Sequence, residues 1–289
     1  MNIGILGNGV FGKALGYVLN KNNHQYEIVG SGEQFSGVMD VIILAVPTQN
    51  LRAALNERPG SYSKETLFIN CAKGIEKESA KFPFDVVNEV TGCTRYAVLG
   101  GPSFADEILA MQPTVVNIAT NKSADQELIV RLLHNDFFIV EAVADIMELE
   151  LAGAMKNVYA IAAGYLAGSG GGENIRAHLQ VVALREYVSL VKVLDGDHDV
   201  LRPSVIGDLI LTCASNTSRN FQYGMAIAKE MDLPDITAEG VHTAEAISAL
   251  ALKSNLRLPL AEAVLSLVRK KNEAGPALYK ALGFDNFKL

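Results

Sequence analysis

The chain has 289 residues, of which 49% are hydrophobic and 20% are charged, and its formal net charge is −7 at pH 7. This length and composition predict two folded domains with sizeable cores and exclude a disordered chain. The acidic balance argues against a nucleic-acid-binding protein, whose surface would need a basic stripe. No uncharged run reaches the roughly 20 residues that a membrane-spanning helix needs, so we expect no integral membrane segment.

The cysteines and the first residues indicate the compartment. Cys71, Cys93 and Cys213 are widely scattered and lack the spacing of metal ligands, which predicts reduced thiols rather than disulfides or a metal site. The chain already has a strand pattern at its start, so we expect no signal peptide. Together these features predict a cytoplasmic protein and give no sign of a metal site.

The first element is a short apolar run, Asn2–Leu6, followed by Gly7-Asn-Gly9-Val-Phe-Gly12 and a helical pattern over Lys13–Leu19. In a dinucleotide-binding strand–turn–helix, the first glycine permits the tight turn and the second lets the backbone approach the pyrophosphate. The third lets the helix lie close to the strand. The helix N-terminus then offers N–H groups and a partial positive charge to the phosphates. We therefore expect a bound nicotinamide or flavin dinucleotide, with a purely structural glycine turn as the alternative.

The second strand, Tyr26–Val29, leads into Gly30-Ser-Gly-Glu33. An acidic residue about 20 positions after the glycines would hold the ribose 2′-hydroxyl and favour NAD. Glu33 lies near that place, and no arginine or lysine stands nearby in the sequence to receive a 2′-phosphate. The segment favours NAD and leaves NADP open.

The remaining pattern changes character once along the chain. Further strand-like runs lie at Val41–Val46, Thr66–Asn70, Arg95–Leu99, Thr114–Ile118 and Phe137–Val140, with helical patterns such as Ser123–Leu133 between several of them. After Ala144 only helical segments follow, at Ile146–Ala167, Ile175–Leu194, Arg219–Met231 and Gly240–Ser254. We expect an α/β fold: a Rossmann-type, doubly wound and mostly parallel sheet over residues 1–143, then an all-helical substrate domain over 144–289.

Ligands of open α/β sheets bind at the carboxyl ends of the strands. Lys73 follows the fourth strand and is well placed to meet an anion, although an exposed loop lysine would give the same pattern. After the fifth strand, Gly101-Pro-Ser103 offers backbone N–H groups and a hydroxyl, which alone is only a turn signal.

In the helical part, Lys156 lies in the most apolar stretch, and its neighbours three and four residues away include no carboxylate. An unpartnered buried ammonium is costly, so Lys156 either has a function or reaches past small residues to the surface. Asp208 begins another apolar stretch, where a helix cap is the alternative. Ser218-Arg-Asn220 is a plausible phosphate cradle or a solvated helix start.

Taken together, these motifs resemble those of bacterial NAD(P)-dependent glycerol-3-phosphate dehydrogenases. The matching segments, spread over nearly the whole chain, are Gly7–Gly12, Val46-Pro47, Lys73-Gly74, Gly101–Ala105, Gly153–Asn157, Gly207–Cys213, Ser218–Asn220 and Glu239-Gly240.

The resemblance implies reversible conversion of dihydroxyacetone phosphate to sn-glycerol 3-phosphate with NAD or NADP, in a homodimer that supplies phospholipid synthesis. It implies that Lys156 is the general acid and base, with Lys73 and Asp208 as further catalytic residues. The substrate-binding residues that it implies are Lys73, Gly101, Ser103, Lys156, Asp208, Ser218, Arg219 and Asn220. The cofactor-binding residues that it implies are Gly7, Gly9, Val10, Phe11, Gly12, Lys73, Ala105, Arg219 and Glu239.

One segment departs from the family pattern. Only Gly30 to Asp40 separate the second strand from the next, too few for a helical crossover, and this shortening affects the adenine-ribose side. Two alternatives stay open: a related two-domain reductase of hydroxy-acid or ketopantoate type, and a module that binds NAD(P) without turnover.

Overall fold

The computed structural model describes residues 1–196, 199–231, 238–269 and 274–285. The chain divides into two compact units, Met1–Glu150 and Leu151–Leu289, which we call unit 1 and unit 2. The division falls within helix α6 (Ile146–Gly168). The domain boundary expected near residue 143 stays a prediction.

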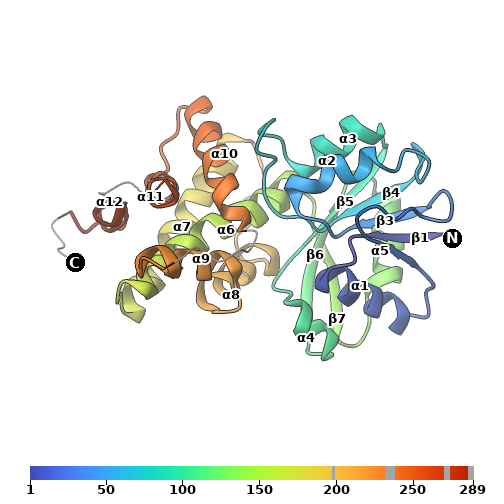
Figure 1. The fold of residues 1–289 in the computed structure, drawn as a ribbon, viewed down its shortest axis with the longest axis horizontal. Helices are drawn as coiled ribbons and strands as arrows, with labels where there is room; N and C mark the ends of the chain where they lie inside the picture. Colours follow the sequence, from blue (N-terminus) through green and yellow to red (C-terminus); the bar gives the residue numbers. More distant parts are fainter. Residues whose placement is uncertain (197–198, 232–237, 270–273, 286–289) are drawn as a thin grey trace. The chain divides into compact units, whose positions relative to one another are not determined.

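Unit 1 is built around a twisted, mostly parallel sheet, as the sequence predicted (Figure 1). Its strands, in the order in which they neighbour one another, are β2 (Glu27–Val29), β1 (Ile3–Leu6), β3 (Val41–Leu44), β4 (Leu67–Asn70), β5 (Arg95–Gly100), β6 (Thr114–Thr120) and β7 (Phe138–Ala142). Within this sheet of described residues, only the β5–β6 pair is antiparallel. Because the chain runs from β1 to β2 on one side and returns to β3 on the other, the topological switch point lies between β1 and β3. Ligands of open sheets bind beside that point.

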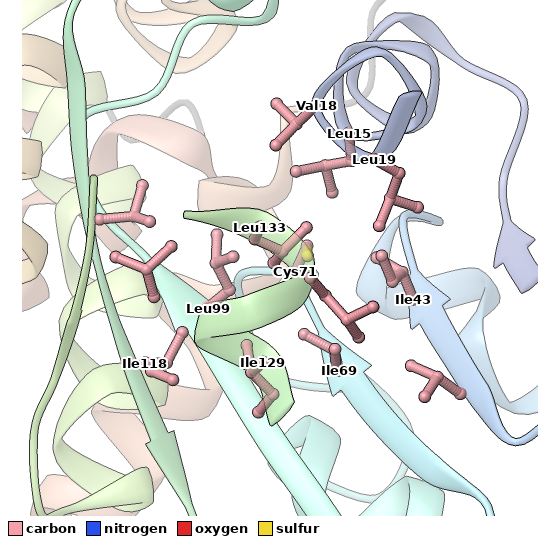
Figure 2. Packing of buried hydrophobic residues seen from close by; sticks show 14 of the residues in the cluster. Leu15, Val18, Leu19, Ile43, Ile69, Cys71, Leu99, Ile118, Ile129 and Leu133 are labelled. Atoms are coloured by element: carbon pink, nitrogen blue, oxygen red, sulfur yellow. The ribbon is translucent and has the colours of Figure 1, made fainter. Parts of the chain in front are cut away.

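Helices cover both faces of the sheet and bury alternate residues of each strand. On β3, Ile43 packs on the face covered by α1 (Val10–Lys21), α4 (Ala105–Leu109) and α5 (Ser123–Leu133). Figure 2 shows the side chains that α1 and α5 contribute to this face. Ile42 and Leu44 pack on the opposite face, under α2 (Thr48–Asn56) and α3 (Pro83–Thr91). Each fully buried aliphatic side chain of this kind contributes roughly 1.5–3 kcal/mol. The double cover explains why the strands read as continuous apolar runs.

The connection from β2 to β3 lacks the usual crossover helix. Residues 30–40, all described, form turns and loop, and Phe35 and Met39 are buried among the residues of the α2–α3 face. A Cβ built on Gly4 of β1 would lie 2.6 Å from the Phe35 ring, so the aromatic ring packs directly on the strand. A short loop with two large apolar side chains thus covers sheet that a helix would otherwise cover.

The described part of unit 2 is helical and contains no strand. After α6 it comprises α7 (Glu173–Val193), the π-helical turn η1 (Pro203–Gly207), α8 (Asp208–Ala214), α9 (Arg219–Ala228), α10 (Glu239–Lys253), α11 (Pro259–Val268) and α12 (Ala274–Ala281). Helices α6 and α9 touch through glycine: a Cβ on Gly224 would lie 1.9 Å from the carbonyl oxygen of Ile161. Across the described residues, we find no helix with the length and apolarity that a membrane crossing requires.

Candidate active site

The glycine turn after β1 has the shape that a dinucleotide requires. Gly7 has φ +120°, and a Cβ there would lie 2.6 Å from the carbonyl oxygen of Ala45. A Cβ on Gly12 would lie 1.9 Å from the carbonyl oxygen of Gly7, so only glycine lets α1 approach the turn so closely. In contrast, a Cβ on Gly9 would meet no described atom within 4 Å, so the backbone there faces open space. Two glycines are dictated by packing and the third leaves room for a pyrophosphate.

The N-terminus of α1 is open to an anion as well. Its cap is Gly9, no side chain of the described residues caps it, and its first turn holds no acidic residue. Val10, the first helical residue, is 57% exposed, whereas Phe11 packs partly on the core beneath. The unpaired N–H groups of such a 12-residue helix and its partial positive charge favour phosphate. The structure therefore fits a dinucleotide at this turn.

At the carboxyl ends of β4 and β5 the structure brings three predicted residues together. The half-buried Lys73 donates a hydrogen bond from Nζ to the carbonyl oxygen of Gly101, at 3.3 Å. The Ser103 hydroxyl donates to the same oxygen at 3.0 Å. Ala105, also predicted, follows as the first residue of α4. This geometry agrees with the expectation that the ends of the strands bring these residues together. Their roles stay predictions.

A buried asparagine holds the turn that carries Lys73. Asn70, the last residue of β4, donates from Nδ2 to the carbonyl oxygen of Ala72, and its Oδ1 accepts from Ala72 N–H, both at 3.0 Å. This reciprocal pair fixes the backbone one residue before the lysine. Sequence analysis missed Asn70, because a polar residue at a strand end gives no signal of its own.

At the end of β2 the structure adds a residue that the sequence did not reveal. Although no cation is near in the sequence, the structure places the guanidinium of Arg58 under the Gly30–Glu33 turn, with hydrogen bonds to the carbonyl oxygens of Gly30 and Glu33. Arg58 is only 2% exposed. Since it comes from the loop after α2, more than twenty positions away in the sequence, no local pattern could have revealed it.

Unit 2 contains a buried ion pair between Lys156 and Asp208. Lys156 on α6 is 8% exposed and Asp208 at the start of α8 is 2% exposed; Nζ donates to Oδ1 at 2.5 Å. Nζ also donates to the hydroxyl of Thr212 at 2.9 Å, and that hydroxyl donates in turn to the carbonyl oxygen of Asp208 at 2.6 Å. The buried ammonium is therefore partnered by a residue 52 positions away. A lysine reaching for the surface is excluded as the explanation of this segment.

The backbone before Asp208 contributes to this placement. The π-helical turn η1 precedes α8 directly, and such turns are rare in helices and frequent at functional sites. Asp208 is the first residue of α8 rather than its cap, so the capping alternative does not describe it. Thr212, one helical turn on, faces the same way; its position four residues after Asp208 was a signal that sequence analysis passed over. Cys213 follows Thr212 in the sequence. Burial raises the pKa of Cys213 to about 12, so its thiol stays neutral beside the ion pair.

The predicted phosphate cradle is mixed in character. Ser218 caps α9, because its hydroxyl accepts from Phe221 N–H at 3.3 Å. Asn220 is buried, and its Oδ1 accepts from Gly240 N–H at 3.0 Å. Arg219 is exposed, whereas Glu239, the first residue of α10, is buried. Ser218 and Asn220 therefore form structural hydrogen bonds, whereas Arg219 is the residue of this cradle that is exposed to solvent.

Comparison with known proteins shows which protein family this chain belongs to. Two family models match: the NAD-dependent glycerol-3-phosphate dehydrogenase N-terminus over residues 32–126 and the corresponding C-terminus over residues 145–278. A glycerol-3-phosphate dehydrogenase [NAD(P)+] of Solidesulfovibrio magneticus is 35% identical over 252 residues, which cover 84% of this chain and 76% of the relative. The chain belongs to the NAD(P)-dependent glycerol-3-phosphate dehydrogenase family.

Further relatives agree with this assignment. The enzyme of the same name from Aromatoleum aromaticum is 38% identical over 79% of this chain and 72% of its own length. The crystal structure of glycerol-3-phosphate dehydrogenase from Coxiella burnetii superimposes with a TM-score of 0.90 at 27% identity, covering 97% of this chain and 98% of that one. The resemblance predicted from the sequence, the fold class and the dinucleotide-dependent class of enzyme are thereby confirmed.

Proposed function

We propose that this chain interconverts dihydroxyacetone phosphate and sn-glycerol 3-phosphate with NAD(H) or NADP(H), and that Lys156 is its general acid and base. The observation that carries this proposal is the buried hydrogen-bonded set of Lys156, Asp208 and Thr212. Burying two opposite charges is costly and often no better for stability than apolar packing. A chemical task for the ammonium accounts for its retention.

Unit 1 supplies most of the proposed cofactor-binding residues, and unit 2 adds Arg219 and Glu239. Gly7, Gly9 and Gly12 would hold the pyrophosphate together with the N–H groups at the start of α1. When bound, the nicotinamide ring supplies or accepts the hydride. Lys73, anchored on the Gly101 carbonyl oxygen, offers a second positive charge to an anionic substrate. We also propose contacts of Val10, Phe11 and Ala105 with the cofactor.

Unit 2 supplies the proton. As the ketone is reduced, negative charge grows on the carbonyl oxygen; the Lys156 ammonium stabilises that charge and gives an Nζ proton to the oxygen. In the opposite direction the neutral amine takes the proton from the hydroxyl. The hydrogen bonds to Asp208 and Thr212 fix the position of Nζ from which the proton would be given. Asp208 holds Nζ in place between turnovers.

The substrate phosphate is assigned to Arg219, whose exposed guanidinium at the start of α9 can form bidentate hydrogen bonds with it. Ser218 and Asn220 support that site, chiefly by fixing the helix start and its attachment to α10. A homodimeric state, a cytoplasmic location and a role in supplying glycerol 3-phosphate for phospholipids complete the proposal.

Steady-state oxidation of NADH and of NADPH with dihydroxyacetone phosphate tests this function, with unphosphorylated dihydroxyacetone as the control substrate. We expect turnover that depends on the phosphate. Cofactor binding without turnover of dihydroxyacetone phosphate would contradict the proposal and favour a module that only binds NAD(P).

A further inference from the structure

The turn after β2 is closed on itself and lies against the glycine turn. The carbonyl oxygen of Gly30 accepts from Glu33 N–H at 3.4 Å, and Glu33 Oε2 accepts from Gly30 N–H at 2.6 Å. Gly7 N–H donates to the carbonyl oxygen of Val29 at 2.8 Å, and a Cβ on Gly30 would lie 2.5 Å from the side chain of Asn8. The Glu33 carboxylate is therefore held beside the dinucleotide turn, at the carboxyl end of β2.

Arg58 holds this turn in place through hydrogen bonds to its backbone. Its Nη2 donates to the carbonyl oxygen of Gly30 at 2.6 Å and its Nε to that of Glu33 at 3.0 Å. Its Nη1 donates to the carbonyl oxygen of Ala54 at 2.7 Å and to the carboxylate of Glu57 at 3.1 Å. Every nitrogen of the guanidinium is thus engaged, and the side chain is 2% exposed. This arginine supports the backbone and is not presented to a ligand phosphate.

Apart from the buried Arg58, the charged residues near the turn in the sequence are acidic. Residues 22–51 contain no lysine or arginine, but they contain Glu27, Glu33 and Asp40. Glu33 is exposed, while its carboxylate is kept in place by the bond to Gly30 N–H. A carboxylate so placed accepts hydrogen bonds from ribose hydroxyls and repels a 2′-phosphate.

We propose that Glu33 makes this enzyme specific for NAD(H) over NADP(H), by accepting a hydrogen bond from the ribose 2′-hydroxyl, and that Arg58 is its positioning residue. The inference rests on the proposed dinucleotide site and goes further by naming the cofactor and the residue that selects it. It also gives the shortened β2–β3 connection a consequence: where a crossover helix is lacking, the buried Arg58 holds the selective turn in its place.

The test is equilibrium binding of NADH and NADPH without substrate, followed by the fluorescence of the nicotinamide ring. We expect the wild-type protein to bind NADH at least about tenfold more tightly than NADPH, the worth of a charge-assisted hydrogen bond. Glu33→Gln keeps an acceptor but removes the charge, so the preference falls by about tenfold, chiefly through tighter NADPH binding. Glu127→Gln, which removes an exposed charge from α5, is the matched control and leaves the ratio unchanged.

The outcomes separate the two proposals. Binding of neither cofactor would overturn the proposed function itself. Equal wild-type affinity for NADH and NADPH, or an unchanged ratio in Glu33→Gln, would overturn the role of Glu33 and leave the proposed function standing. For Arg58, the variant Arg58→Lys keeps the charge but cannot reach both carbonyl oxygens, so we expect a lower NADH-to-NADPH preference. A wild-type ratio in folded Arg58→Lys would refute the positioning role.

Discussion

Neutralising Asp208 should destabilise unit 2 far more than neutralising a surface carboxylate. In the Asp208→Asn variant the ammonium of Lys156, which is 8% exposed, loses the charge that its Nζ meets at 2.5 Å. Removing one member of a buried ion pair costs about 3–5 kcal/mol, because the other is left uncompensated. Against a total stability of about 5–15 kcal/mol for a typical domain, that is a large loss.

A double-mutant cycle in urea measures this coupling. The variants are Lys156→Met, Asp208→Asn and the combination, each unfolded while the helical circular dichroism signal is followed. We expect each single variant to lose several kcal/mol and the double variant to lose less than the sum, since it buries no charge. The control is Glu173→Gln, which removes the 87% exposed partner of Arg176 and should cost less than about 1 kcal/mol. A loss of unfolding free energy in the double variant equal to the sum of the two single losses would refute the coupling between Lys156 and Asp208.

Three further predictions follow from the geometry. Burial raises the pKa of Glu150 to about 8, above its unfolded value near 4.5, so the stability that the protonated carboxyl contributes falls as the pH rises from about 4.5 and is fully lost above about 8; Glu150→Gln should flatten that fall in thermal unfolding measured between about pH 5 and pH 8. Gly12→Ala, whose Cβ would lie 1.9 Å from a carbonyl oxygen, should lower both stability and NADH affinity, whereas Gly9→Ala should lower affinity alone. Arg219→Ala should raise the Michaelis constant for dihydroxyacetone phosphate at least about tenfold; an unchanged constant would remove Arg219 from the phosphate site.

Local patterns in the sequence predicted most of the fold. The Gly7–Gly12 turn and the strand ends that carry Lys73 and Gly101 each depend on a few consecutive residues, so the sequence places them well. The antiparallel pairing of β6 against β5 was not readable, because both strands are apolar runs and direction depends on the connections between them. The helical character after residue 144 followed from the end of the strand pattern and from the long helical segments after it.

The contacts that matter for function join distant parts of the chain. Around Lys156 the sequence shows only small or apolar helical neighbours, and its partner Asp208 comes from another helix 52 positions later. Arg58 likewise reaches the Gly30–Glu33 turn from the loop after α2. Propensity and spacing describe elements, whereas such pairings depend on how the elements pack, and that information is not local.

The central claim is that Lys156 moves the proton, and steady-state oxidation of NADH by Lys156→Met with saturating dihydroxyacetone phosphate tests it most directly. NADH affinity, measured in parallel, shows that the variant is folded and loaded. We predict wild-type NADH affinity with a turnover number lower by about 10²–10⁴-fold, the range of general acid–base catalysis. Turnover within a few-fold of wild type would contradict the assignment of Lys156 as the proton donor.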